Sequence, residues 1–144
     1  MEQGKGKWRF TSPTHSVRAL AQALDELDEE GGVSARHKRY CANQEVLVQG
    51  MEQIGFRTLL PKEMQSPIIT AFRYPNHSFE FDPFYQALKR RRFVIYPGKV
   101  TRTPTFRIGT IGHVFPNDIA ELIDAVDLSM QELGLGRNTP SQLL

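Results

Sequence analysis

This chain of 144 residues has one cysteine, no long apolar run and no large excess of positive or negative charge. Its single cysteine, Cys41, excludes an intramolecular disulfide and a Cys-rich zinc or iron–sulfur site, and fits a reducing compartment. No stretch approaches roughly 18 consecutive apolar residues, and the polar N-terminus lacks a signal-peptide core. We therefore expect a cytoplasmic protein without a membrane partner.

Common catalytic and metal-binding motifs are also missing. The four histidines, at 15, 37, 77 and 113, show neither H-E-x-x-H nor zinc-pair spacing, so we predict no metal site. Neither a nucleophile elbow nor a phosphate-binding P-loop is present. The net charge of +2 gives no general attraction to nucleic acid. The basic run 89–92 suits a helix C-terminus, and DNA or RNA binding through it is kept only as an alternative.

The length and an ordinary composition, 40% hydrophobic and 24% charged, suit one soluble domain with one core. Apolar spacings of three and four residues predict helices, while short β-branched and aromatic runs predict strands. The helices are expected at 13–30, 33–54, 82–92 and 116–133, and the strands at 56–60, 67–74, 93–96 and 103–109. For the first helix we predict Ser12 as N-cap and Pro13 as first helical residue. This order predicts an α+β fold in which helices cover one face of a small, mostly antiparallel sheet.

Two segments have features that suggest ligand binding. Arg107 lies in a predicted strand between apolar residues and is followed by glycines, which allow a ligand or another backbone to approach. Its guanidinium is suited to hold a carboxylate through two parallel hydrogen bonds, although an arginine on an exposed strand face explains the residue equally well. The segment 11–14, near Trp8, offers hydroxyls and free N–H groups to a phosphate, although an ordinary helix start is the better explanation of these residues taken alone.

Five motifs in unbroken order together resemble the C-terminal portion of the 2-aminoethylphosphonate:pyruvate transaminases, which are fold-type I aminotransferases that use pyridoxal phosphate. The resemblance spans residues 8–133. The motifs are Trp8-Arg9-Phe10-Thr11-Ser12-Pro13-Thr14-His15, Glu30-Gly31-Gly32-Val33 with Arg36-His37, Ser66-Pro67-Ile68-Ile69-Thr70-Ala71-Phe72, Phe93-Val94-Ile95-Tyr96-Pro97-Gly98-Lys99-Val100, and Phe106-Arg107-Ile108-Gly109.

The resemblance implies roles for three residues. Arg107 falls at the arginine that binds the substrate carboxylate, and Thr11 at a hydroxyl lent by a neighbouring subunit to the phosphate of the cofactor. Trp8 falls at an aromatic near the same phosphate, whereas Lys99 receives no role. The implied enzyme is a cytoplasmic homodimer in phosphonate catabolism. It moves the amino group of 2-aminoethylphosphonate to pyruvate and gives phosphonoacetaldehyde and L-alanine.

The resemblance leaves out the large domain that holds the Schiff-base lysine. None of the six lysines lies in a segment like that lysine motif, so no catalytic residue is assigned and the chain alone is expected to be inactive. The expected partner is a second subunit or the large domain. The alternative is a non-catalytic binding or regulatory module that pairs with a separately encoded cofactor domain. Residues 1–7 are expected to be a flexible N-terminus, 8–133 the aminotransferase domain with its leading inter-domain helix, and 134–144 a loose tail.

Overall fold

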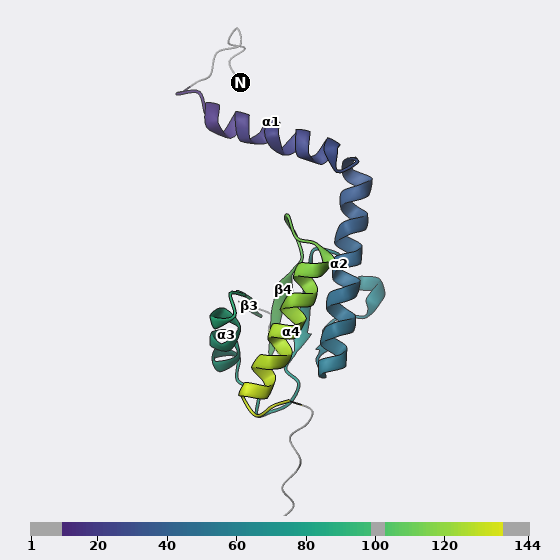
Figure 1. Ribbon diagram of the computed structural model, residues 1–144, viewed down its shortest axis with the longest axis vertical. Helices are drawn as coiled ribbons and strands as arrows, with labels where there is room; N and C mark the ends of the chain where they lie inside the picture. Colours follow the sequence, from purple (N-terminus) through teal and green to yellow (C-terminus); the bar gives the residue numbers. More distant parts are fainter. Residues whose placement is uncertain (1–9, 99–102, 137–144) are drawn as a thin grey trace, which may run out of the picture. The chain divides into compact units, whose positions relative to one another are not determined.

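The computed structural model describes residues 10–98 and 103–136 (Figure 1). The chain divides into two compact units, Met1–Arg36 and His37–Leu144. The second unit contains the sheet and the hydrophobic core.

The first unit is built on helix α1, Thr14–Glu29, as the apolar spacing predicted. None of its residues is buried, and Val17, Leu20 and Leu24 are between 49% and 61% exposed. The prediction that Ser12 caps the helix is wrong. Pro13 occupies the cap position with φ −78° and ψ 59°, and the Ser12 carbonyl accepts the Thr14 N–H. This inverse γ-turn satisfies the first free N–H through the backbone, so no side-chain cap forms.

Helix α2, Gly32–Ile54, begins after Gly31, whose φ of +100° ends α1. Its second half buries Leu47 and Met51 in the core. At its end Gly55 takes φ +116°, and the Phe56 N–H donates to the Met51 carbonyl at 3.0 Å. These bonds form a Schellman motif, which lets the chain turn directly into the sheet.

The sheet is fully antiparallel, in the order β1-β2-β4-β3, which confirms the predicted architecture. Its long central pair is β2, Ile69–Arg73, with β4, Thr105–Gly109, and the short edges are β1, Arg57–Thr58, and β3, Tyr96–Pro97. The 3-10 turn η1, Lys62–Met64, lies between β1 and β2. The predicted strand 93–96 is wrong in extent, because residues 93–95 only lead out of the preceding helix and pairing starts at Tyr96.

Helices α2 and α4 lie across one face of the sheet, and α3 packs against α4 (Figure 1). Helix α3 is Phe81–Arg90 and α4 is Pro116–Glu132. The α3 start differs from the expected Asp82 because Glu80 takes the cap position. Phe106 of β4 is fully buried under these helices, in ring contact with Phe56, Phe72 and Phe84.

The end of α3 repeats the Schellman motif with an arginine where glycine is usual. Arg92 has φ +72°, and the Phe93 N–H donates to the Leu88 carbonyl at 3.0 Å. A side chain in this left-handed conformation costs about 1 kcal/mol, so we expect Arg92→Gly to raise the free energy of unfolding by roughly that amount. Urea unfolding measures the change. The matched control is Gln86→Gly in the same helix, which should lower stability by about 1 kcal/mol; a loss in both variants would contradict the interpretation.

Candidate functional site

Arg107 lies on the face of the sheet that the helices leave open. In β4 its neighbours Phe106 and Ile108 are buried in the core, so strand alternation turns Arg107 to the other face. The register sets it directly between Ala71 of β2 and Tyr96 of β3. This central, half-buried place favours ligand binding over the alternative of a solvated arginine on an exposed strand face.

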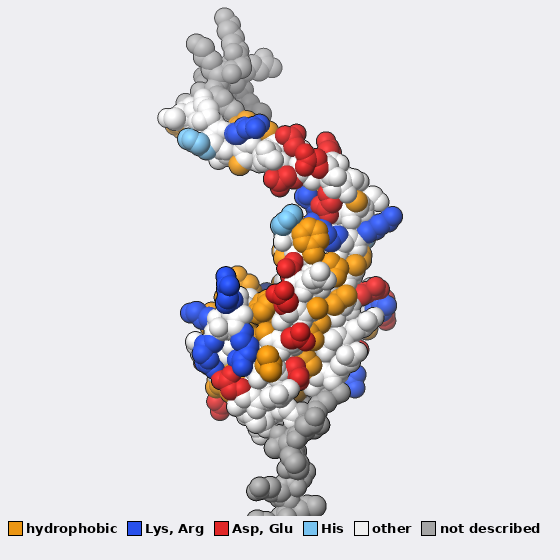
Figure 2. All heavy atoms as spheres, viewed as in Figure 1, with side chains coloured by type: hydrophobic (Ala, Val, Ile, Leu, Met, Phe, Trp, Pro, Cys, Tyr) orange, Lys and Arg blue, Asp and Glu red, His pale blue; other side chains and the backbone are white. Residues whose placement is uncertain are grey.

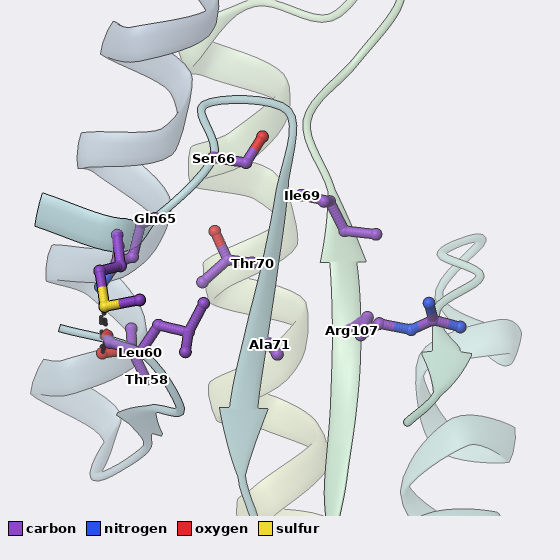
Figure 3. Close-up of a pocket in the computed structure, with 9 residues that line it drawn as sticks. Thr58, Leu60, Gln65, Ser66, Ile69, Thr70, Ala71 and Arg107 are labelled. Carbon is purple, nitrogen blue, oxygen red and sulfur yellow. Dashed lines mark hydrogen bonds between the residues drawn. The ribbon is translucent and has the colours of Figure 1, made fainter. Parts of the chain in front are cut away.

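The guanidinium of Arg107 has few partners within the described part of the chain. Its Nη2 donates one long bond, 3.4 Å, to the Pro97 carbonyl, and its buried Nε has no hydrogen-bond partner there. The side chain extends away from β2 (Figure 3). Because a buried N–H without an acceptor is costly, the geometry favours a ligand that supplies acceptor oxygens.

A cavity of about 220 Å³ opens beside Arg107 on the same face (Figure 3). Among the described residues Arg107 is its only charged lining residue, and the cavity is largely apolar. A charge-assisted hydrogen bond is stronger in such surroundings than in water. The other lining residues are Thr58, Leu60, Met64, Gln65, Ser66, Ile69, Thr70 and Ala71.

Gln65 holds one wall of this cavity in place. Its Nε2 donates to the Leu60 carbonyl at 2.9 Å and to the Thr58 hydroxyl at 3.2 Å, and its Oε1 accepts the Gln44 amide at 2.5 Å. Sequence reasoning missed Gln65 as well as Met64 and Leu60. Residues in or beside a short 3-10 turn carry no sequence signal that they face a strand distant in the chain.

The loop after β4 is fixed by α2, through contacts that sequence reasoning also missed. Arg39 Nη1 donates to the carbonyls of Gly112 and Val114 at 2.9 and 2.7 Å, and Asn43 donates to Val114 at 2.8 Å. The Arg39 guanidinium also lies 4.8 Å from the centre of the Phe115 ring. These contacts anchor the chain just beyond Arg107, so they help to hold the end of β4.

The other predicted ligand-binding residues fall elsewhere. Thr11 is exposed ahead of α1 in the first unit, whereas Arg107 belongs to the second. A shallow hollow of about 280 Å³ lies along the start of α1, lined by Ser12, Thr14, Val17, Arg18 and Ala21 but not by Thr11. Trp8 and Lys99 lie outside the described residues.

The basic run at the end of α3 is partly paired. Arg90 and Arg91 both bind Glu132 of α4, Arg91 at 2.8 Å. These hydrogen bonds and charges, that of Arg91 foremost, hold the pKa of Glu132 below its usual range. Figure 2 shows a group of Lys and Arg side chains around α3. The pairing supports the interpretation of this run as a favourable helix end.

The described residues contain neither a metal-binding cluster nor a membrane span. No group of three or more His, Cys, Asp or Glu side chains is placed to hold a metal ion in 10–98 and 103–136. Within the same ranges, no helix combines the length and the apolar character needed to cross a bilayer.

Curated relatives in sequence are 2-aminoethylphosphonate–pyruvate transaminases. The one from Phocaeicola vulgatus is 62% identical over 126 residues, which cover 88% of this chain and 35% of that protein. The one from Syntrophobacter fumaroxidans is 58% identical over 135 residues, covering 93% and 36%. The chain thus spans about a third of the length of these relatives. No family model matches.

Solved structures with the same fold are also aminotransferases. Pyridoxamine–pyruvate aminotransferase from Mesorhizobium loti matches with a TM-score of 0.79 and 23% identity, over 90% of this chain and 34% of that one. Alanine–glyoxylate aminotransferase from Nostoc sp. matches with a TM-score of 0.77 and 22% identity, over 86% and 33%. Sequence and fold together confirm the resemblance that the motifs indicated.

Proposed function

We propose that this chain, which corresponds to the C-terminal portion of the 2-aminoethylphosphonate–pyruvate transaminases, provides the carboxylate-binding part of such an enzyme. The complete enzyme would transfer the amino group of 2-aminoethylphosphonate to pyruvate and release phosphonoacetaldehyde and L-alanine. The observation that carries the proposal is Arg107, whose Nε lacks a partner among the described residues and which lines a largely apolar cavity.

Arg107 would bind the carboxylate of pyruvate. A planar guanidinium donates two parallel hydrogen bonds to a carboxylate, which fixes the plane of the keto acid as well as its position. The aliphatic side chain of Ile69, which lines the cavity with Arg107, suits the methyl group of pyruvate and keeps competing water away. The chain's own contribution to the reaction is therefore to orient the substrate.

The described residues do not fit covalent attachment of pyridoxal phosphate, the cofactor of the proposed enzyme. Lys38, Lys62 and Lys89 are the lysines among them, and none lines the Arg107 cavity. The Nζ of Lys62 lies 3.8 Å from Oε1 of Glu45, and the Nζ of Lys89 lies 6.0 Å from the centre of the Tyr85 ring. We therefore propose that the reactive lysine comes from a complementary domain and that this chain alone is inactive.

Thr11 and Trp8 remain proposed contacts to the cofactor phosphate of a neighbouring subunit in a homodimer. The exposed position of Thr11 ahead of α1 supports this role, because its hydroxyl is accessible to a partner. The apolar side chains exposed along α1 support the proposal that either a second subunit or the large domain covers this helix.

A chimera tests the proposal. In it, this chain replaces the matched third of the Phocaeicola vulgatus transaminase, with which it shares 62% identity over 126 residues. We expect the chimera to form alanine from 2-aminoethylphosphonate and pyruvate, and the chain alone to form none. A folded chimera that shows the cofactor absorbance but transfers no amino group between these substrates would contradict the substrate assignment. Such a result would favour the non-catalytic binding module instead.

A further inference from the structure

Three arginines share the open face of the sheet. The register sets Arg57 of β1 directly opposite Arg73 of β2, while Ala71, two residues before Arg73, faces Arg107 of β4. Side chains two residues apart on a strand project from the same face, so Arg73 is the diagonal neighbour of Arg107. The open face therefore carries three arginines, of which Arg57 and Arg73 are direct cross-strand partners.

Arg57 and Arg73 have little to neutralise them. Neither forms an ion pair with any residue of 10–98 or 103–136, and Arg73 makes one long hydrogen bond, 3.4 Å, to the Leu59 carbonyl. Like charges directly opposite each other destabilise a sheet. An anion placed between the two guanidinium groups would reverse this repulsion.

A hollow of about 530 Å³ adjoins Arg73. No Asp or Glu of the described chain lines it, whereas His77 and Thr103 offer polar hydrogen-bonding groups. Asn76 Oδ1 already accepts the Ser78 N–H, so the groups left on that amide are donors. The remaining lining residues are Tyr74, Pro75, Phe79 and Pro104.

We propose that Arg73 and Arg57, which are cross-strand partners in β2 and β1, form a second anion site that binds a phosphate-type group, and that the hollow beside Arg73, which Arg57 does not line, holds the remainder of a phosphate ester. A tetrahedral dianion has enough acceptor oxygens for two guanidinium groups at once, while a carboxylate neutralises only one of them. The volume of the hollow is sufficient for a small phosphate ester. The site is distinct from the carboxylate-binding role of Arg107 and does not depend on it.

Titration of the full chain with inorganic phosphate at constant ionic strength tests the site, with amide and arginine Nε–H shifts followed by NMR. We expect saturable shifts centred on residues 73–77, and Arg73→Gln should weaken binding by about tenfold or more. Arg57→Gln is the second variant and should weaken binding in the same direction. Arg73→Lys should retain part of the affinity, because it keeps the charge but not the planar fork.

Two control variants distinguish this site from a general charge effect and from the Arg107 site. Arg92→Gln removes an exposed arginine of another element and should leave phosphate binding unchanged; equal weakening would show a non-specific charge effect and overturn the proposal. Arg107→Gln should weaken phosphate binding less than Arg73→Gln does while it removes carboxylate binding, so the two proposals fail separately. Unaltered binding in both Arg73→Gln and Arg57→Gln would also overturn the site. A titration with glycerol phosphate identifies the kind of ligand. Tighter binding of glycerol phosphate than of inorganic phosphate would show that the hollow accommodates the organic part of a phosphate ester.

Discussion

Replacement of Arg107 by lysine in the chimera is expected to lower kcat/KM for pyruvate by about 100-fold, roughly 3 kcal/mol. Lysine keeps the positive charge, but its ammonium is a point charge and cannot form the two parallel hydrogen bonds of a guanidinium. It would also stand in a largely apolar cavity with unmatched donors. Steady-state kinetics with varied pyruvate measures the loss, and most of it should appear in KM because the carboxylate is bound before and during the reaction.

The matched control for this prediction is Arg92→Lys, at the exposed end of α3 and away from the cavity lining. It should leave the kinetics of the chimera unchanged. An Arg107→Lys chimera that keeps the KM for pyruvate of the parent would show that another group binds the carboxylate. Arg107 would then be a structural strand residue.

Phe106→Ala should lower the free energy of unfolding by about 3–5 kcal/mol. The Phe106 ring is fully buried, and its centre lies 5.4 Å from that of Phe56, 5.5 Å from Phe84 and 5.8 Å from Phe72. Truncation leaves a cavity where β4 meets the helices, and those rings cannot all move to fill it. Urea unfolding followed by circular dichroism measures the change.

Two further variants keep this prediction testable if Phe106→Ala does not fold. Phe106→Leu should cost less because it retains most of the apolar volume. Tyr96→Ala, on the exposed edge strand β3, should cost about 1 kcal/mol or less, since that side chain is 61% exposed. Equal losses in Tyr96→Ala and Phe106→Leu would contradict a core centred on Phe106.

Helix predictions from the sequence succeeded where the pattern was long. The apolar spacings along α2 and α4 extend over several turns, and Gly55 and Gly134 end these helices with positive φ, as the sequence suggested. Predictions that depended on one residue failed. Ser12 does not cap α1, because the backbone around Pro13 satisfies the free N–H instead.

The sequence showed Arg107 between apolar residues in a predicted strand, and strand alternation turns its side chain to the face away from that of Phe106 and Ile108. The motif order also indicated the family from sequence alone. Both are local properties, since the face of a strand residue and a motif depend on near neighbours in the chain.

Only the tertiary structure decided what lies beside Arg107. The cavity joins it to Met64 and Gln65, and the strand register brings Arg57 opposite Arg73. Strand pairing connects segments distant in the chain, and a shift of one residue would turn each side chain to the other face. The sequence therefore determined which elements form and which way Arg107 points, whereas the register of three strands determined the surroundings in which its charge acts.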